Sequence, residues 1–263
     1  MKFENINTYN WINAIMGMRN PKNSWYKSDT ETIWLTNEEI PEQNEKNGYI
    51  ITTNGDLNLA VCLKIGDNDL KLMKSLISAG PEHRKFLRQI MVSVEVTAPL
   101  YWWKEMDTYK IGIVSDSCST MHTIHTHSLE DLSCYEMNSL PSLPSSVKEY
   151  NDDHFKDHLK NLERIRIVYL KKLQEAKETT DPYLRTMLEK EAKGYWKEII
   201  KWLPCNWLQK RSLTMNYENL YSIIHQRKNH KLNEWSGLDD NNTPNFMEDF
   251  ILKLPYAKEL LLR

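Results

Sequence analysis

The chain has 263 residues, of which 40% are hydrophobic and 27% charged, and its formal net charge is −2. This is the composition of an ordinary globular protein with a sizeable core, and it gives no global attraction to nucleic acid or anionic membrane. Glycine is scarce, at 8 residues, or about 3% where roughly 7% is usual. Neither GxGxxG nor GxxxxGK[ST] occurs, which excludes the common glycine-loop dinucleotide and nucleoside-triphosphate binders.

The sequence carries no targeting signal that we can identify. No apolar run approaches the ~18 residues of a membrane span, and the N-terminal segment lacks the apolar core of a signal peptide. The cysteines, Cys62, Cys118, Cys134 and Cys205, show no CxxC spacing, which favours free thiols in a reducing compartment. We therefore expect a cytoplasmic protein with neither a membrane nor a nucleic-acid partner.

Short elements are predicted in the N-terminal third. Thr8 to Met16 has the spacing of a short helix, and Met18 to Asn47 is typical of a loop with brief ordered pieces. Gly48 to Thr53 predicts a strand that ends at the turn signal Asn54-Gly55.

Stronger periodicity begins at residue 67. Asp67, Asn68 or Asp69 can cap a helix that ends at Gly80-Pro81. The elements predicted next are a short helix over Glu82 to Leu87, a β-branched strand over Ile90 to Thr97 and a helix over Leu100 to Met106.

The C-terminal half is predicted to be helical beyond a hinge at Leu140 to Ser146. Apolar residues recur at three- and four-residue steps over Phe155 to Ala176 and Leu184 to Leu203, which indicates an antiparallel pair of long helices. Further helices are predicted over Asn216 to about Trp235 and over Phe246 to Leu261. This order predicts an α+β fold with a mainly antiparallel sheet packed against long helices and a helix-rich C-terminal half.

Histidines are the candidate metal ligands. His122, His125 and His127 could hold zinc or iron, and His154 and His158 have the i, i+4 spacing that can chelate on a helix. No cysteine or carboxylate joins the first group at a familiar spacing, and neighbouring aspartates suit a solvated helix start in the second. We therefore favour hydrogen-bonded histidines and predict no metal site.

Two sequence patterns are consistent either with a ligand-binding site or with a purely structural role. The aromatic block Tyr101 to Trp103, beside Lys104, could stack a base or a flavin, although core packing is the simpler interpretation. Asn216 and Arg227 are 11 residues apart, so on a helix they share one face about 16 Å apart. A ligand contact or an interface explains this pair, and so does a salt bridge from Arg227 to an acidic neighbour.

Several short motifs, taken in order, resemble the flavin-dependent thymidylate synthases (the ThyX-like fold). Gly80-Pro81-Glu82-His83 followed by Phe86 is similar to that family's Glu-His segment. Leu203-Pro204 is similar to its Leu-Pro, and Asn216 with Arg227 keeps the spacing of its late helix.

The resemblance spans residues 67–236, and we expect one ThyX-like domain over 1–263. In that domain 1–66 is a divergent N-terminal part and 237–263 a C-terminal helical tail. The chain also resembles a widespread group of uncharacterised proteins from Firmicutes and their phages, which brings no function with it. The segments that carry this second likeness are Ala98 to Glu105, Asp107 to Lys110, Ser117 to His122 and Leu254 to Ala257.

The family resemblance implies reductive methylation of dUMP, with FAD as the flavin, methylenetetrahydrofolate as the carbon donor and NADPH as the reductant. In such a protein the cofactor carries the chemistry, and the chain binds and orients. The resemblance implies that Arg227 is the catalytic residue that anchors the uracil. It implies cofactor contacts from Glu82, His83, Asn216 and Trp103.

The same resemblance implies substrate contacts from Lys104, Lys110, Ser117 and Ser119, in a homotetramer whose sites lie between subunits. The nucleotide is then the main ligand, and a host protein is a further candidate partner.

The chain also departs from the family pattern. The family's Arg-His-Arg triplet is absent, with Lys110-Ile111-Gly112 in its place, and Pro81 stands where a histidine is usual. Losing fork-shaped donors weakens the binding of phosphates unless Lys104, Lys110 or Arg84 substitutes. Two hypotheses follow: a divergent thymidylate-synthase-like enzyme that binds dUMP and FAD, or a catalytically degenerate, phage-linked homologue that binds a nucleotide or a host protein in counter-defence.

Overall fold

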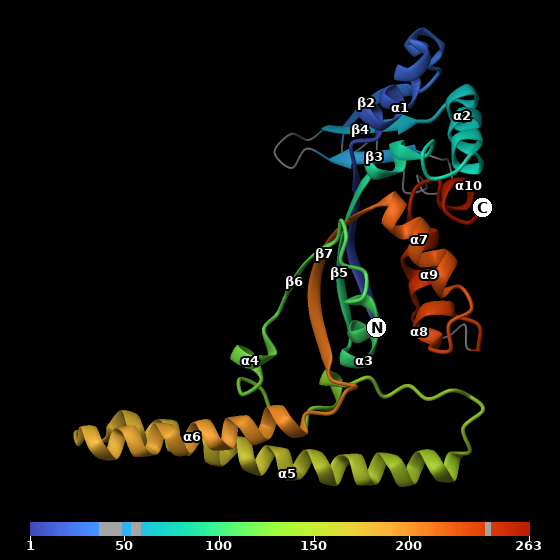
Figure 1. Ribbon diagram of the computed structural model, residues 1–263. Helices are drawn as coiled ribbons and strands as arrows, with labels where there is room; N and C mark the ends of the chain where they lie inside the picture. Colours follow the sequence, from blue (N-terminus) through green and yellow to red (C-terminus); the bar gives the residue numbers. More distant parts are fainter. Residues whose placement is uncertain (37–48, 54–58, 240–242) are drawn as a thin grey trace. The chain divides into compact units, whose positions relative to one another are not determined.

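The computed structural model describes residues 1–36, 49–53, 59–239 and 243–263 (Figure 1). The predicted turn at Asn54-Gly55 lies outside these residues. The strands are β1 (Lys2–Tyr9), β2 (Glu31–Thr36), β3 (Tyr49–Thr53), β4 (Leu59–Lys64), β5 (Met91–Pro99), β6 (Val114–Ser117) and β7 (Leu208–Asn216). The helices are α1 (Trp11–Arg19), α2 (Asp67–Ser78), α3 (Leu100–Met106), α4 (Thr120–Thr123), α5 (Ser145–Glu178), α6 (Pro182–Trp202), α7 (Tyr217–Arg227), α8 (Asn233–Ser236), α9 (Phe246–Asp249) and α10 (Ala257–Leu260).

Two antiparallel sheets organise the strands. The larger has the order β1-β5-β7-β6, and the smaller has the order β2-β4-β3, with Cys62 opposite both Ile33 and Ile51. Together with the long helices they confirm the predicted α+β class. The chain divides into two units: unit 1 holds Met1–Val96, Met106–Asp116 and Arg211–Arg263, and unit 2 holds Thr97–Glu105 and Ser117–Lys210.

Strand β5 follows from its sequence pattern. Val92, Val94 and Val96 are buried while the alternate residues are half-exposed, as one strand face on a core requires. The prediction for this strand is confirmed, as are those for α2, α3, α5, α6 and β3.

The N-terminus differs from the prediction, because β1 occupies residues expected to begin a helix. Asn5 has a φ of 52° and interrupts the alternation of the strand, which hides its period-2 pattern in the sequence. Asn10, with a φ of 69°, ends the strand, and α1 begins at Trp11. The predicted short helix before β5 is a 3₁₀ turn over Lys85–Arg88.

Helix α2 is capped from a distant segment rather than by its own first residues. The Asp29 carboxylate accepts the backbone N–H groups of Asn68 and Asp69 at 2.9 and 3.0 Å. Asp69 itself is fully buried, and its carboxylate accepts from Arg19 Nε at 2.7 Å and from the hydroxyls of Ser28 and Thr30 at 2.6 and 2.7 Å. Burial raises the pKa of Asp69, but the hydrogen bonds and the Arg19 charge outweigh it, so its pKa lies below the usual value.

Unit 2 is built on the antiparallel pair α5 and α6, which lie side by side in Figure 1. Their shared core includes Leu159, Leu162 and Ile199. Glu163, on α5, accepts the Leu129 backbone N–H at 2.7 Å and pairs with Arg166 at 2.8 Å, which ties an adjoining loop to the helix. Among the described residues, none of the helices combines the length and apolarity needed to cross a membrane.

The two C-terminal helices that were predicted as continuous are interrupted. The first ends at Arg227 and resumes as the short α8, because residues 228–232 are mostly polar and have no apolar face to bury. The second is broken after Asp249, where Phe250 leaves the helical conformation and a 3₁₀ turn covers Ile251–Lys253. Pro255 and Tyr256, whose φ is 52°, then precede α10. Phe246 of α9 packs on Trp235 with ring centroids 5.0 Å apart, so tertiary packing holds these short pieces.

Replacing Asp69 with Asn should lower the free energy of unfolding by about 3 kcal/mol at pH 7, because buried Arg19 loses its counter-charge. The ionised carboxylate contributes fully to the free energy of unfolding above its unfolded-state pKa of about 3.9. This contribution is lost as the pH falls through the lower folded-state pKa. Urea titrations should therefore show the gap between wild type and variant closing below about pH 4. Asp67→Asn, exposed on the same helix, is the control; a gap that does not depend on pH would contradict this account.

Candidate functional site

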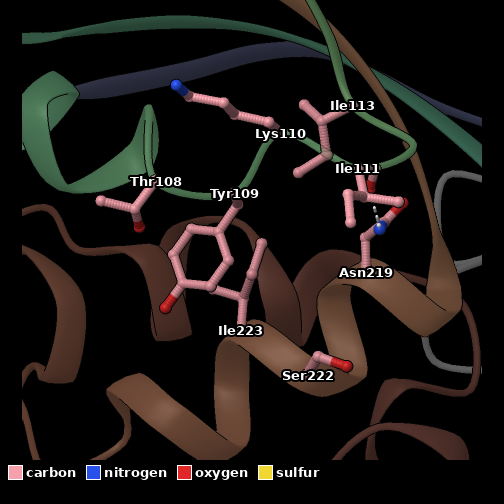
Figure 2. Close-up of a pocket in the computed structure, with 8 residues that line it drawn as sticks. All are labelled: Thr108, Tyr109, Lys110, Ile111, Ile113, Asn219, Ser222 and Ile223. Carbon is pink, nitrogen blue, oxygen red and sulfur yellow. Dashed lines mark hydrogen bonds between the residues drawn. The ribbon is translucent and has the colours of Figure 1, made fainter.

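A loop over residues 107–113 lies beside α7 in unit 1, and two hollows open against it. One measures about 230 Å³ and lies between this loop and α7 (Figure 2). The other measures about 400 Å³ and reaches Leu213 of β7. Tyr109, Lys110 and Ile113 line both hollows, so one loop forms the wall between them.

The first turn of α7 holds this loop. Asn216 caps the helix: its side chain accepts the Asn219 N–H at 2.9 Å, and the Asn219 side chain accepts the Asn216 N–H at 3.1 Å. The Asn219 amide also donates to the Ile111 carbonyl at 2.9 Å, the dashed contact of Figure 2. Gly112 has a φ of +76°, and a Cβ there would lie 3.2 Å from the Asn219 side-chain oxygen, so glycine lets the loop approach the helix.

Arg227 ends α7 and is held by the same loop. Its Nε–H donates to the Tyr109 hydroxyl at 2.7 Å, and its guanidinium lies 5.3 Å from the ring centres of both Tyr109 and Trp235. These contacts give the Arg227 guanidinium an aromatic and hydroxyl environment. Arg227 lines neither hollow, whereas Tyr109 lines both.

Cationic and hydroxyl groups surround the larger hollow. Lys110 and Ser115 line it. Asp107, also in its wall, pairs with Arg211 at 2.7 Å through a carboxylate that is 54% exposed. Amines, guanidinium and hydroxyls are the donors that phosphate oxygens accept from.

A third hollow in unit 1, of about 600 Å³, brings Glu82 and His83 to its rim. Both side chains are exposed. Lys22 and Lys85 add two ammonium groups, and α2 contributes apolar side chains, including Leu76. The combination of an apolar wall with clustered cations suits a ligand that has a flat organic part and negative charge.

The other candidate residues lie in unit 2. Trp103 is 1% exposed, its indole donates to the Gln209 carbonyl at 3.0 Å, and its ring packs edge-on against Trp102. It therefore contributes to the core, and the geometry of one chain offers no ring face for a flavin. Lys104 lies 3.3 Å from the Cys205 thiol.

Of the two candidate serines of unit 2, Ser117 is exposed and Ser119 is half-buried. Ser117 ends the exposed strand β6, and Ser119 precedes α4, where its carbonyl accepts from Thr123 Oγ1 at 2.8 Å. Arg84, a candidate replacement for the missing arginines, lies in unit 1 and pairs with Glu218 at 3.0 Å, so its charge is already engaged.

The histidines do not gather into a ligand set. His125 packs edge-on against Tyr169, and His122 and His127 are exposed. Across the described segments, no three His, Cys, Asp or Glu side chains come together in a way that could hold a metal ion.

Sequence reasoning missed several residues that line these hollows, and also Arg211, which pairs with Asp107 in the lining of the larger one. Asn219 carried a signal, since Asn at a cap and a polar residue three positions later form a capping box. Tyr109 lay inside a motif quoted for a family likeness but had no role of its own. Arg211, Lys22 and Lys85 carried no signal, because their position depends on which segments fold together.

Gly112→Ala should lower the free energy of unfolding by about 1–2 kcal/mol, because a side chain there is strained at positive φ and crowds Asn219. Gly194→Ala is the matched control: it lies inside α6, where an added Cβ would meet nothing within 4 Å. It should stabilise by about 0.5–1 kcal/mol. Both changes in the free energy of unfolding can be measured by chemical denaturation. If they are equal, the close approach of the loop to α7 at Gly112 is contradicted.

No protein-family model and no curated protein matches the chain. Solved structures with a similar fold include two of flavin-dependent thymidylate synthases. Flavin-dependent thymidylate synthase ThyX from Helicobacter pylori, complexed with FAD and dUMP, has a TM-score of 0.57 at 14% identity, covering 99% of this chain and 98% of that one. A second Helicobacter pylori ThyX structure with FAD and dUMP has a TM-score of 0.54 at 14% identity, covering 97% and 96%.

The resemblance predicted from short motifs is thus confirmed for the fold. The match covers 99% of this chain. At 14% identity the likeness concerns the backbone arrangement alone. The chain has a distant ThyX-like fold.

Proposed function

We propose that the protein binds a pyrimidine nucleotide, dUMP, at the two hollows beside residues 107–113. One observation carries this proposal: the loop that replaces the family's Arg-His-Arg triplet forms the wall of both hollows and places Lys110 in each. The similar fold of ThyX with FAD and dUMP supports the choice of ligand.

The proposed phosphate contact is Lys110, supported by Ser115 in the lining of the larger hollow. Arg211 pairs with Asp107, which lies in the same lining. An ammonium group binds phosphate as a point charge, so one lysine replaces part of what forked guanidinium groups supply. Arg227 and Asn216 are the proposed contacts of the base and the adjoining cofactor. Lys104, Ser117 and Ser119, for which the resemblance also implies substrate contacts, lie in unit 2.

FAD is the proposed cofactor, and the hollow of about 600 Å³ fits it by chemistry. A diphosphate needs cations, which Lys22 and Lys85 supply, and a ring system needs an apolar wall, which Leu76 and its neighbours supply. His83 adds a ring with hydrogen-bonding nitrogens. Glu82 completes the rim as an acceptor. When bound, reduced FAD supplies hydride; this chain's residues bind and orient it.

With both ligands bound, the proposed reaction is reductive methylation of dUMP, which also requires methylenetetrahydrofolate and NADPH. We propose a cytoplasmic homotetramer as the working form. In each chain Arg227 would donate to the uracil carbonyl oxygen O4 and favour its enolate form, because a guanidinium is a donor only.

A second candidate is nucleotide or host-protein binding without catalysis, in a phage-linked protein that acts in counter-defence. The loop 107–113 favours it, since Ile111 is 90% exposed and Gly112 brings no charge where the family has arginines. An exposed apolar side chain at such a place suits a protein contact better than a phosphate contact.

Calorimetric titration should detect dUMP binding, and Lys110→Ala should weaken it about tenfold by removing a charge-assisted contact. Deoxyuridine, which lacks the phosphate, should bind wild type and this variant equally. Lys177 is exposed on α5, so Lys177→Ala is the matched control and should leave the affinity for both ligands unchanged. A wild-type protein that binds no dUMP, or equal losses for both ligands, would refute the assignment.

Added FAD should raise the melting temperature, and Lys22→Ala and Lys85→Ala should each weaken FAD binding about tenfold while sparing riboflavin, which has no diphosphate. Lys71→Ala, exposed on α2, is the control. If the protein is colourless and its melting temperature does not change when FAD is added, the flavoenzyme hypothesis is refuted. The second candidate, nucleotide or host-protein binding without catalysis, then remains.

A further inference from the structure

We propose that Tyr109 is a positioning residue that orients the Arg227 guanidinium and thereby sets the preference for uracil over cytosine. This inference rests on the proposed function and adds a specificity determinant to it. Tyr109 lies in the loop that separates the two hollows.

The contact between the two side chains is short and directional. Arg227 Nε donates to the Tyr109 hydroxyl at 2.7 Å, a charge-assisted hydrogen bond in a half-buried place. Because Nε is the inner nitrogen of the guanidinium, a bond there fixes the plane of the whole group.

Aromatic rings hold the same guanidinium. Its carbon lies 5.3 Å from the Tyr109 ring centre and 5.3 Å from that of Trp235, which is fully buried. Trp235 belongs to the fixed core with Phe246, whereas Tyr109 belongs to the loop wall. Of the two rings that contact the guanidinium, Tyr109 is therefore the one that also borders the proposed ligand site.

The Tyr109 hydroxyl is itself oriented by a second contact. It donates to the Gln226 side-chain oxygen at 3.3 Å, which turns its lone pairs toward Arg227. The hydroxyl thus acts as an acceptor for the guanidinium at the end of α7.

Tyr109 also connects Arg227 to the hollows. Figure 2 shows its ring beside Ile223 in the smaller hollow, with Lys110 extending away from it. Arg227 lines neither hollow, and Tyr109 is the residue that both lines the hollows and contacts the guanidinium, so it links Arg227 to a ligand bound there.

The chemistry of the guanidinium gives the expected selectivity. Arginine only donates hydrogen bonds; O4 of uracil accepts them, while the N4 amino group of cytosine is itself a donor. An oriented guanidinium therefore favours dUMP over dCMP, and one released from Tyr109 loses part of that preference.

The test is Tyr109→Phe, which removes the hydroxyl and keeps the ring, with calorimetric titration of dUMP and dCMP. We expect dUMP binding to weaken about tenfold and dCMP binding to stay within about twofold of wild type. In an Arg227→Ala background, Tyr109→Phe should cause no further loss, because it acts through the missing guanidinium. Tyr183→Phe, on an exposed tyrosine of α6, should change nothing.

The outcomes separate this inference from the proposed function. If wild type binds dUMP but Tyr109→Phe leaves the dUMP-to-dCMP ratio unchanged, or lowers both affinities equally, the positioning role is refuted and the nucleotide site stands. If the losses from Tyr109→Phe and Arg227→Ala add, Tyr109 acts independently of Arg227, which also refutes the positioning role. If wild type binds neither nucleotide, both proposals fall.

Discussion

The paired amides of Asn216 and Asn219 at the start of α7 determine the geometry of the candidate site. Asn216 ends strand β7 and caps the helix, and Asn219 closes the capping box while bonding the Ile111 carbonyl. One helix terminus thereby joins a strand, a helix and a loop. Because the loop is held at the start of α7, Tyr109 can contact Arg227 at the end of the same helix. The held loop also forms the wall of the two hollows.

Scarcity of glycine bears on how the proposed nucleotide would be held. A glycine-rich loop presents backbone N–H groups to phosphates, whereas in the proposed function side chains would supply the phosphate contacts. The hollows of unit 1 accordingly gather Lys110 in one place and Lys22 with Lys85 in another. Such ammonium groups are flexible and strongly hydrated, so their placement depends on the apolar walls beside them. The arginine triplet of the family whose fold the chain shares has no counterpart in the loop.

Part of the candidate site could be predicted from the sequence. The family resemblance singled out Arg227, Asn216, Lys110, Glu82 and His83, and each lies in unit 1. Lys110 lines the two hollows beside residues 107–113, and Glu82 and His83 line a third. The same reasoning selected Trp103, because aromatic side chains occur both in cores and in ligand sites. In the structure Trp103 is buried and belongs to the core. Tyr109 and Arg211 were overlooked, since a single tyrosine or arginine carries no periodic or spacing signal.

The sequence by itself determined the elements whose signal is local. Alternating valines predicted β5, and apolar steps of three and four predicted α5 and α6, because each pattern reports burial of one face. Tertiary structure decided the rest. The strand β1, interrupted at Asn5, the remote cap of α2 by Asp29 and the loop held by Asn219 depend on segments far apart in the chain. Their partners are chosen by packing and hydrogen-bond satisfaction, which no local pattern encodes.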